Sequence, residues 1–122
     1  MKRLLLLALA LVPIAAGAAQ PVAVSGRWDV SANIGGTASN ITCTFTQKDT
    51  DLTGSCETDQ TPHEVTGKVD GKTVTWQFKT DYEGQTLTVI YSGTLDSPDK
   101  FDGTVDVQPL GVSGDFSATR AK

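Results

Sequence analysis

Few side chains of this sequence could do chemistry, and their spacing favours a structural role. His63 is the single histidine, so a metal site built on several histidines is excluded. No serine or cysteine is spaced with His63 and a third orienting group, as nucleophilic catalysis requires. Two pairs of closely spaced aspartates lie in predicted turns and lack the spacing and closing glutamate of a calcium loop; they are Asp49 and Asp51, and Asp96 and Asp99. We therefore expect no catalytic residue, no metal site and no cofactor.

The two cysteines, Cys43 and Cys56, are the second chemical feature. The residues between them read as a β-hairpin that turns at residues 48–51, and this register places the cysteines directly opposite each other. A redox-active pair would need a Cys-x-x-Cys sequence, which is absent. In an exported chain, this arrangement predicts one structural disulfide.

Residues 1–19 have the pattern of a signal peptide. A cationic pair precedes an apolar run over residues 4–16, which is shorter than the roughly 20 residues of a membrane span. Cleavage after Ala19 leaves a single domain over residues 20–122 and moves the net charge from −4 to −6, because the cationic pair is lost. We expect export to the bacterial periplasm or beyond, without a membrane anchor.

The acidic balance and the size of the mature chain limit the possible partners. Nucleic-acid binding requires clustered lysines and arginines, which this chain lacks, so no nucleic-acid partner is expected. A domain of this length buries about 65% of its unfolded surface, which is enough for an independent core. The mature chain is therefore expected to be a monomeric globular domain.

One hairpin sets the pattern of the mature chain. Asp70 and Gly71 form the two-residue signal of a type I′ turn. That turn would place Val65 opposite Trp76 and His63 opposite Phe78. One face of the hairpin would then be apolar and the other polar.

The same alternation runs through eight strands of about seven to nine residues, joined by turns and without a helix. In later hairpins it sets Trp76 opposite Tyr91, Phe78 opposite Val89 and Gly93 opposite Gly103. Seven of the eight aromatic residues share the inner parity: Trp28, Phe45, Trp76, Phe78, Tyr91, Phe101 and Phe116. A meander with one apolar face hides it by closing on itself. The fold prediction is all-β, an eight-stranded antiparallel up-and-down β-barrel with one disulfide; a two-layer sandwich is the alternative.

Closure would set Trp28 beside Arg120, and these residues carry a family resemblance. Gly26-Arg27-Trp28 matches the Gly-x-Trp of the lipocalin and calycin superfamily, and Arg120 matches the basic residue that stacks over that tryptophan. The chain resembles a small bacterial lipocalin-like barrel. It is shorter than a typical lipocalin and has no helix after Arg120. It is less similar to the periplasmic inhibitors of secreted metalloproteases. Those act through a free N-terminal segment, and here only residues 20–25 precede the first strand.

The barrel interior is the candidate binding site. The end near Trp28 has bulky residues and tight turns and should be sealed, whereas the other end is predicted to carry longer loops over residues 35–40, 57–62 and 80–86. A ligand that enters there would meet His63, Trp76, Phe78, Val89 and Tyr91. The alternative is that these rings fill the core.

We therefore expect an exported, non-catalytic barrel that binds a small apolar or aromatic ligand. The alternative function is a protein-binding barrel, such as a protease inhibitor or accessory module, that acts through its rim loops or N-terminal segment.

Overall fold

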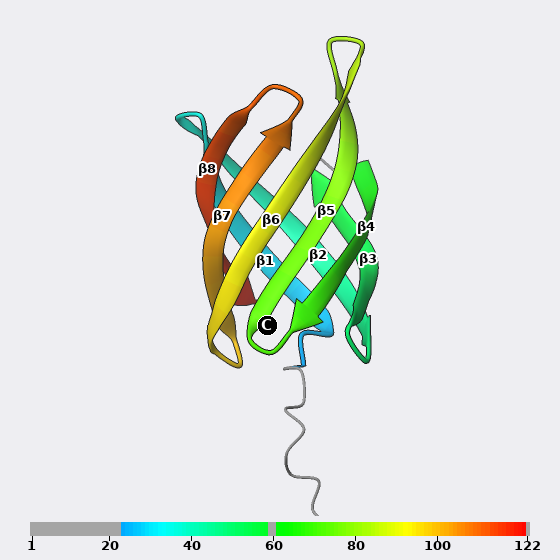
Figure 1. Cartoon of the computed structure of the whole chain (residues 1–122), viewed down its shortest axis with the longest axis vertical. Helices are drawn as coiled ribbons and strands as arrows, with labels where there is room; N and C mark the ends of the chain where they lie inside the picture. The colour runs from blue at the N-terminus through cyan, green and yellow to red at the C-terminus, as the bar shows by residue number, and fades with distance from the viewer. Residues whose placement is uncertain (1–22, 59–60, 122) are drawn as a thin grey trace, which may run out of the picture.

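The computed structural model describes residues 23–58 and 61–121, which form a closed barrel of eight antiparallel strands (Figure 1). Each strand pairs with the next along the chain, and the last strand pairs with the first. The strands are β1 (Gly26–Ile34), β2 (Thr37–Lys48), β3 (Asp51–Thr58), β4 (Thr61–Asp70), β5 (Thr73–Tyr82), β6 (Gln85–Ser97), β7 (Lys100–Gln108) and β8 (Val112–Arg120). The predicted meander barrel is confirmed, and the sandwich alternative is wrong.

The predicted signal peptide, residues 1–19, lies outside the described residues. Within residues 23–58 and 61–121, no helix is long and apolar enough to cross a membrane.

Inward-facing residues alternate with exposed ones along every strand, as the sequence predicts. All seven aromatic residues of the inner parity are buried, whereas Tyr82 at the end of β5 is 56% exposed. Gly93 and Gly103 face each other in the wall as predicted, and a Cβ at Gly93 would lie 2.8 Å from the Phe116 ring. The missing side chain therefore makes room for an aromatic neighbour.

Most of the predicted registers are confirmed. Trp76 lies opposite Tyr91 and Phe78 opposite Val89. The disulfide between Cys43 and Cys56 forms across β2 and β3. One row of opposed residues crosses five strands, and its members are Arg120, Trp28, Cys43, Cys56 and His63.

The predicted register between β4 and β5 is wrong by two residues. Trp76 lies opposite Gly67, not Val65, and His63 has no backbone partner on β5. The turn residues are Gly71 and Lys72, and of these only Gly71 has a positive φ, at 61°. A glycine at the first central position is the pattern of a type II′ turn, not the predicted type I′. Because the shift is two residues, every side chain keeps its predicted face.

The predicted long loops at the end opposite Trp28 are also wrong. The strands continue into these segments, so that Gly35–Gly36 and Glu83–Gly84 are two-residue turns. Strands β3 and β4 likewise extend to Thr58 and from Thr61. Positive φ values at Gly36 and Gly84 permit such short connections. No long loop therefore covers this end of the described barrel.

Candidate functional site

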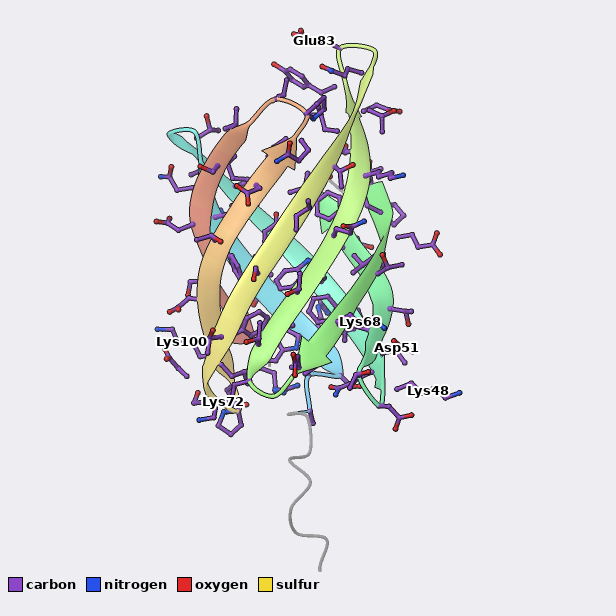
Figure 2. The ribbon with its side chains drawn as sticks, viewed as in Figure 1. Lys48, Asp51, Lys68, Lys72, Glu83 and Lys100 are labelled. Atoms are coloured by element: carbon purple, nitrogen blue, oxygen red, sulfur yellow. A yellow bond between two sulfur atoms is a disulfide. The ribbon has the colours of Figure 1, made fainter. Side chains whose placement is uncertain are left out.

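The barrel has two unlike ends. We call the end that carries Trp28 and Arg120 the floor, and the end that carries Ile34 and His63 the rim. Figure 2 shows Lys48, Lys68, Lys72 and Lys100 toward the floor and Glu83 at the opposite tip of the β5–β6 hairpin. The Lys68 ammonium contacts the Asp51 carboxylate at 2.6 Å, and this hydrogen bond and charge lower the pKa of Asp51.

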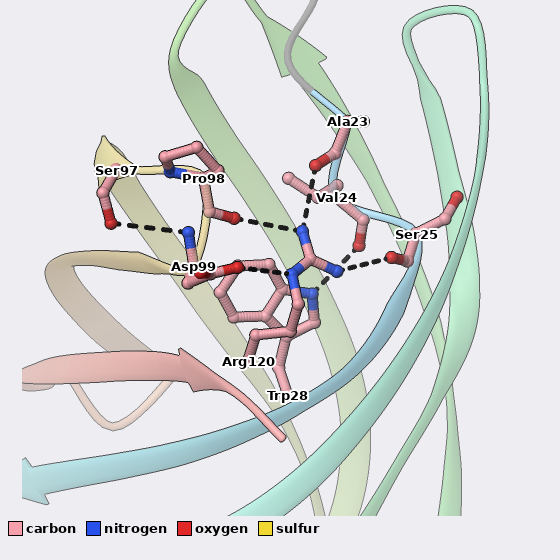
Figure 3. A network of polar contacts seen from close by, with 8 residues as sticks. All are labelled: Ala23, Val24, Ser25, Trp28, Ser97, Pro98, Asp99 and Arg120. Carbon is pink, nitrogen blue, oxygen red and sulfur yellow. Dashed lines mark hydrogen bonds and ion pairs between the residues drawn. The ribbon is translucent and has the colours of Figure 1, made fainter. Parts of the chain in front are cut away.

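The floor is closed by the Arg120 guanidinium, which lies 4.4 Å from the centre of the Trp28 ring (Figure 3). The predicted pairing of Trp28 with Arg120 across β1 and β8 is confirmed. The guanidinium also donates hydrogen bonds to four acceptors: Ser25 O at 2.8 Å, Pro98 O at 3.1 Å, Ala23 O at 3.2 Å and Asp99 Oδ1 at 3.2 Å. One side chain therefore ties β8 to the N-terminal segment and to the β6–β7 turn.

The segment Ala23–Ser25 completes the floor. Val24 is fully buried, its carbonyl accepts the Trp28 Nε1–H at 3.0 Å, and its N–H donates to Gln47 Oε1 at 2.7 Å. The described part of the N-terminal segment is therefore bound to the barrel.

The middle of the barrel is filled by rings around Trp76. Trp76 is fully buried and stacks on Tyr91, with 4.7 Å between the ring centres and 2° between the planes. Three further rings meet it edge-on at 5.1–5.6 Å: Phe45, Phe116 and Phe101. Burial raises the pKa of Tyr91 to about 12. One face of each of these two predicted binding residues is thus covered by the other.

The indole N–H of Trp76 is the exception in this packing. It is buried and has no hydrogen-bond partner. Buried donors normally find a partner, so this orphaned group needs an explanation.

Toward the rim the packing becomes a stack of rings. The ring centres of Phe78 and Tyr91 are 6.1 Å apart, with 27° between the ring planes. The ring centres of His63 and Phe78 are 5.2 Å apart, with 25° between the planes. The structure therefore brings four of the five predicted residues into one stack, in the order Trp76, Tyr91, Phe78 and His63. The fifth, Val89, lies opposite Phe78 on β6.

Hydrogen bonds fix the His63 ring at the outer end of this stack. Nδ1 lies 3.2 Å from the Lys79 carbonyl oxygen, and Nε2 lies 2.9 Å from Thr58 Oγ1. Because a carbonyl only accepts, the Lys79 contact places a proton on Nδ1, and in the neutral ring Nε2 then accepts from the Thr58 hydroxyl.

The wall is incomplete beside this histidine. Strands β4 and β5 pair only over Thr66–Asp70 and Thr73–Gln77. We call the unpaired ends, Thr61–Val65 of β4 and Phe78–Tyr82 of β5, the seam. The strand pattern did not predict the seam, although Pro62 is a signal for it, because proline cannot donate a ladder hydrogen bond.

Two hollows lie over the β4–β5 boundary. One of about 420 Å³ is lined by Glu64, Thr66, Gln77, Phe78 and Lys79. One of about 280 Å³ is lined by Thr66, Gly67, Lys68, Thr75, Trp76 and Gln77. Phe78 and Trp76, two of the predicted binding residues, border these hollows, but they are only 5% and 0% exposed, so their rings stay on the inner side of the wall.

A larger, open hollow of about 580 Å³ lies over β1, β7 and β8 and includes Ser31, Asp102 and Asp115. Among the residues that the structure describes, no group of three or more histidines, cysteines or carboxylates could hold a metal ion.

The chain matches no protein-family model. No curated protein matches it either. Its likeness is to solved structures of redesigned β-barrels. One, named b11L5F_LGL, is 22% identical with a TM-score of 0.61, over 80% of this chain and 91% of that one. Another, mFAP1 bound to DFHBI, is 18% identical with a TM-score of 0.58, over 79% of this chain and 94% of that one. At these identities the likeness is in the fold.

Proposed function

We propose that this chain is an exported, non-catalytic, lipocalin-like barrel that binds a small apolar or aromatic molecule on its rim side. The observation that carries the proposal is the ring stack from Trp76 to His63. Its inner member is fully buried, but Phe78 and Val89 keep 5% and 7% of their surface exposed. A flat molecule would extend or join such a stack, since offset-stacked rings attract each other beyond their burial.

Two further observations support a small-molecule guest. The barrel mFAP1, which shares this fold, is described as bound to the small molecule DFHBI. The indole N–H of Trp76 lacks a partner, and a guest whose acceptor atom reached this ring would supply one.

Export is supported by the disulfide between Cys43 and Cys56. Disulfides persist in the periplasm and outside the cell and are rare in the cytosol. The signal-peptide pattern of residues 1–19 points the same way.

The test compares two phenylalanines at opposite ends of the barrel. Phe78→Leu shortens the stack on the rim side, and Phe101→Leu is the matched change at the floor, where Phe101 meets Trp28 at 4.8 Å. The chain without residues 1–19 is titrated with DFHBI and with a neutral solvatochromic dye. We expect saturable binding that Phe78→Leu weakens at least about fivefold, the loss of roughly 1 kcal/mol of ring contact. Phe101→Leu should leave the affinity unchanged. Absence of saturable binding, or equal losses in both variants, contradicts the proposal.

A second candidate function, binding of a protein partner at the rim, rests on a different observation. Tyr82 and Leu110 are the exposed large hydrophobic residues of the described chain, at 56% and 48%, and both lie at the rim. The inhibitor form of this function receives no support, because Ala23–Ser25 are held at the floor. For a purified candidate partner, a Tyr82→Ser/Leu110→Ser variant should lose protein binding and keep dye binding; unchanged protein binding would exclude this surface.

A further inference from the structure

We propose that the seam between β4 and β5 is a binding site for a planar nitrogen heteroaromatic ring, which takes the place of the His63 imidazole on Phe78. This inference rests on the proposed function and specifies its ligand class and its location. The ligand approaches through the wall of the barrel, and its ring N–H donates to the Lys79 carbonyl.

The backbone of the seam has hydrogen-bonding groups that the ladder does not use. If the register of β4 and β5 continued, Glu64 would face Lys79 and Pro62 would face Asp81. Backbone groups alternate between the two sides of a strand, and Val69 bonds toward β3, to the Thr50 carbonyl. The even-numbered residues of β4 therefore direct their backbone groups to β5. The Glu64 N–H and the Lys79 carbonyl both face the seam without a ladder partner.

The His63 side chain fills the place of the missing backbone hydrogen bond. The His63 Nδ1–H donates a hydrogen bond to the Lys79 carbonyl oxygen at 3.2 Å. The imidazole also stacks on the Phe78 ring, with 5.2 Å between the ring centres and 25° between the planes. The chain thus displays the chemistry that this place accepts: a flat ring, a ring nitrogen that donates, and an aromatic surface below. A free heteroaromatic ring offers the same contacts.

The surface over the seam has space for a small molecule. The hollow of about 420 Å³ over the seam has Phe78 in its lining and is walled by Glu64 and Lys79, which carry opposite charges. This volume falls within the roughly 300–1,000 Å³ of small-molecule sites. The His63 ring is only half-buried, so its displacement into solvent exposes little apolar surface.

The experiment uses two probes of nearly the same shape, benzimidazole and 1-methylbenzimidazole, of which only the first has a ring N–H. Binding to the chain without residues 1–19 is followed by amide chemical shifts. We expect benzimidazole to shift the amides of Glu64, Phe78 and Lys79 and to bind at least about fivefold more tightly than its methylated form, as expected for one hydrogen bond. His63→Ala should tighten benzimidazole binding about tenfold, because no ring has to be displaced.

The control is Leu110→Ala at the rim, which should leave the benzimidazole affinity unchanged. Shifts confined to Leu87 and Val107, two buried residues of β6 and β7 near the rim, or equal affinity for both probes, overturn the seam site and leave the binding barrel standing. If neither benzimidazole nor the dyes bind, both proposals fail. A His63→Ala variant that binds benzimidazole no better than the wild type overturns the displacement of the imidazole.

Discussion

The floor and the rim are two ends of one barrel that are closed by different means. At the floor, a single guanidinium joins Trp28, the N-terminal segment and the β6–β7 turn, and fully buried Val24 lies beside them. At the rim, no comparable side chain spans the described strands, and His63 bridges only to the neighbouring strands β3 and β5. The floor holds the strands together, while the rim leaves rings and backbone groups incompletely covered.

This difference separates the end that holds the strands together from the end that we propose binds a ligand. A side chain that bonds several acceptors at once and also stacks on a buried ring is hard to replace, because no single water molecule reproduces all of its contacts. A side chain that makes two hydrogen bonds at a half-exposed position is easily replaced by water or by a ligand. Mutations at the two ends should therefore have unequal effects on folding.

The largest effect is expected at the floor. Arg120→Met keeps an apolar stem over Trp28 but removes the charge and four hydrogen bonds, and should lower the free energy of unfolding by about 3 kcal/mol. His63→Met, the matched change at the rim, should lower it by less than about 1 kcal/mol. Urea unfolding measures both values. Equal losses would remove the distinction between the two ends.

The disulfide lies between the two ends, since Cys43 faces Trp28 and Cys56 faces His63. A Cys43→Ala/Cys56→Ala variant should lose about 2 kcal/mol of stability. This is less than the roughly 3 kcal/mol expected from loop closure, because a hairpin already restricts the unfolded chain. Thermal or urea unfolding gives the value, and a reductant should then have no further effect on the variant. A loss below about 0.5 kcal/mol would show that the strand pairing alone fixes this part of the wall.

Alkaline pH tests how tightly the middle of the barrel is sealed from the rim. Burial raises the pKa of Tyr91 to about 12, whereas an unfolded tyrosine ionises near about 10. The folded state gains stability from keeping Tyr91 protonated. This contribution is complete below pH 10 and is lost as the pH rises toward 12, where the free energy of unfolding falls by up to about 1.4 kcal/mol per pH unit. In a Tyr82→Phe background, absorbance at 295 nm reports Tyr91 alone. A midpoint near 10 would mean that solvent reaches the ring through the rim.

The smallest effect is expected for Leu110, which is 48% exposed in the β7–β8 turn. Leu110→Ser should change the free energy of unfolding by no more than about 0.5 kcal/mol, because the side chain buries little surface. Chemical denaturation checks this value. A larger loss would mean that the rim contributes to the core after all.

The sequence predicted the floor better than the rim for physical reasons. Alternation has a period of two, so Trp28, Trp76 and Phe101 were assigned to the inside without knowledge of the turns. The same period hid the two-residue error at Gly71, because a shift of two leaves each face unchanged.

Features that depend on the path of the backbone were not predicted. Polar residues between strands were interpreted as loops at the rim, although the strands extend through most of them to tight turns. The seam depends on where two strands stop pairing, and Pro62 alone does not specify that point. The stacking order from Trp76 to His63 likewise depends on barrel geometry, which the strand pattern does not contain.

The row of opposed residues from Arg120 through Cys43 and Cys56 to His63 has one last consequence. Strands in a closed barrel are tilted, and the stagger between them, together with their number, sets the barrel radius. A covalent link between β2 and β3 admits only one stagger at that step, because a slip of one residue would turn a sulfur outward. Oxidation of the two cysteines thus fixes one of the eight staggers that together set the diameter of the barrel.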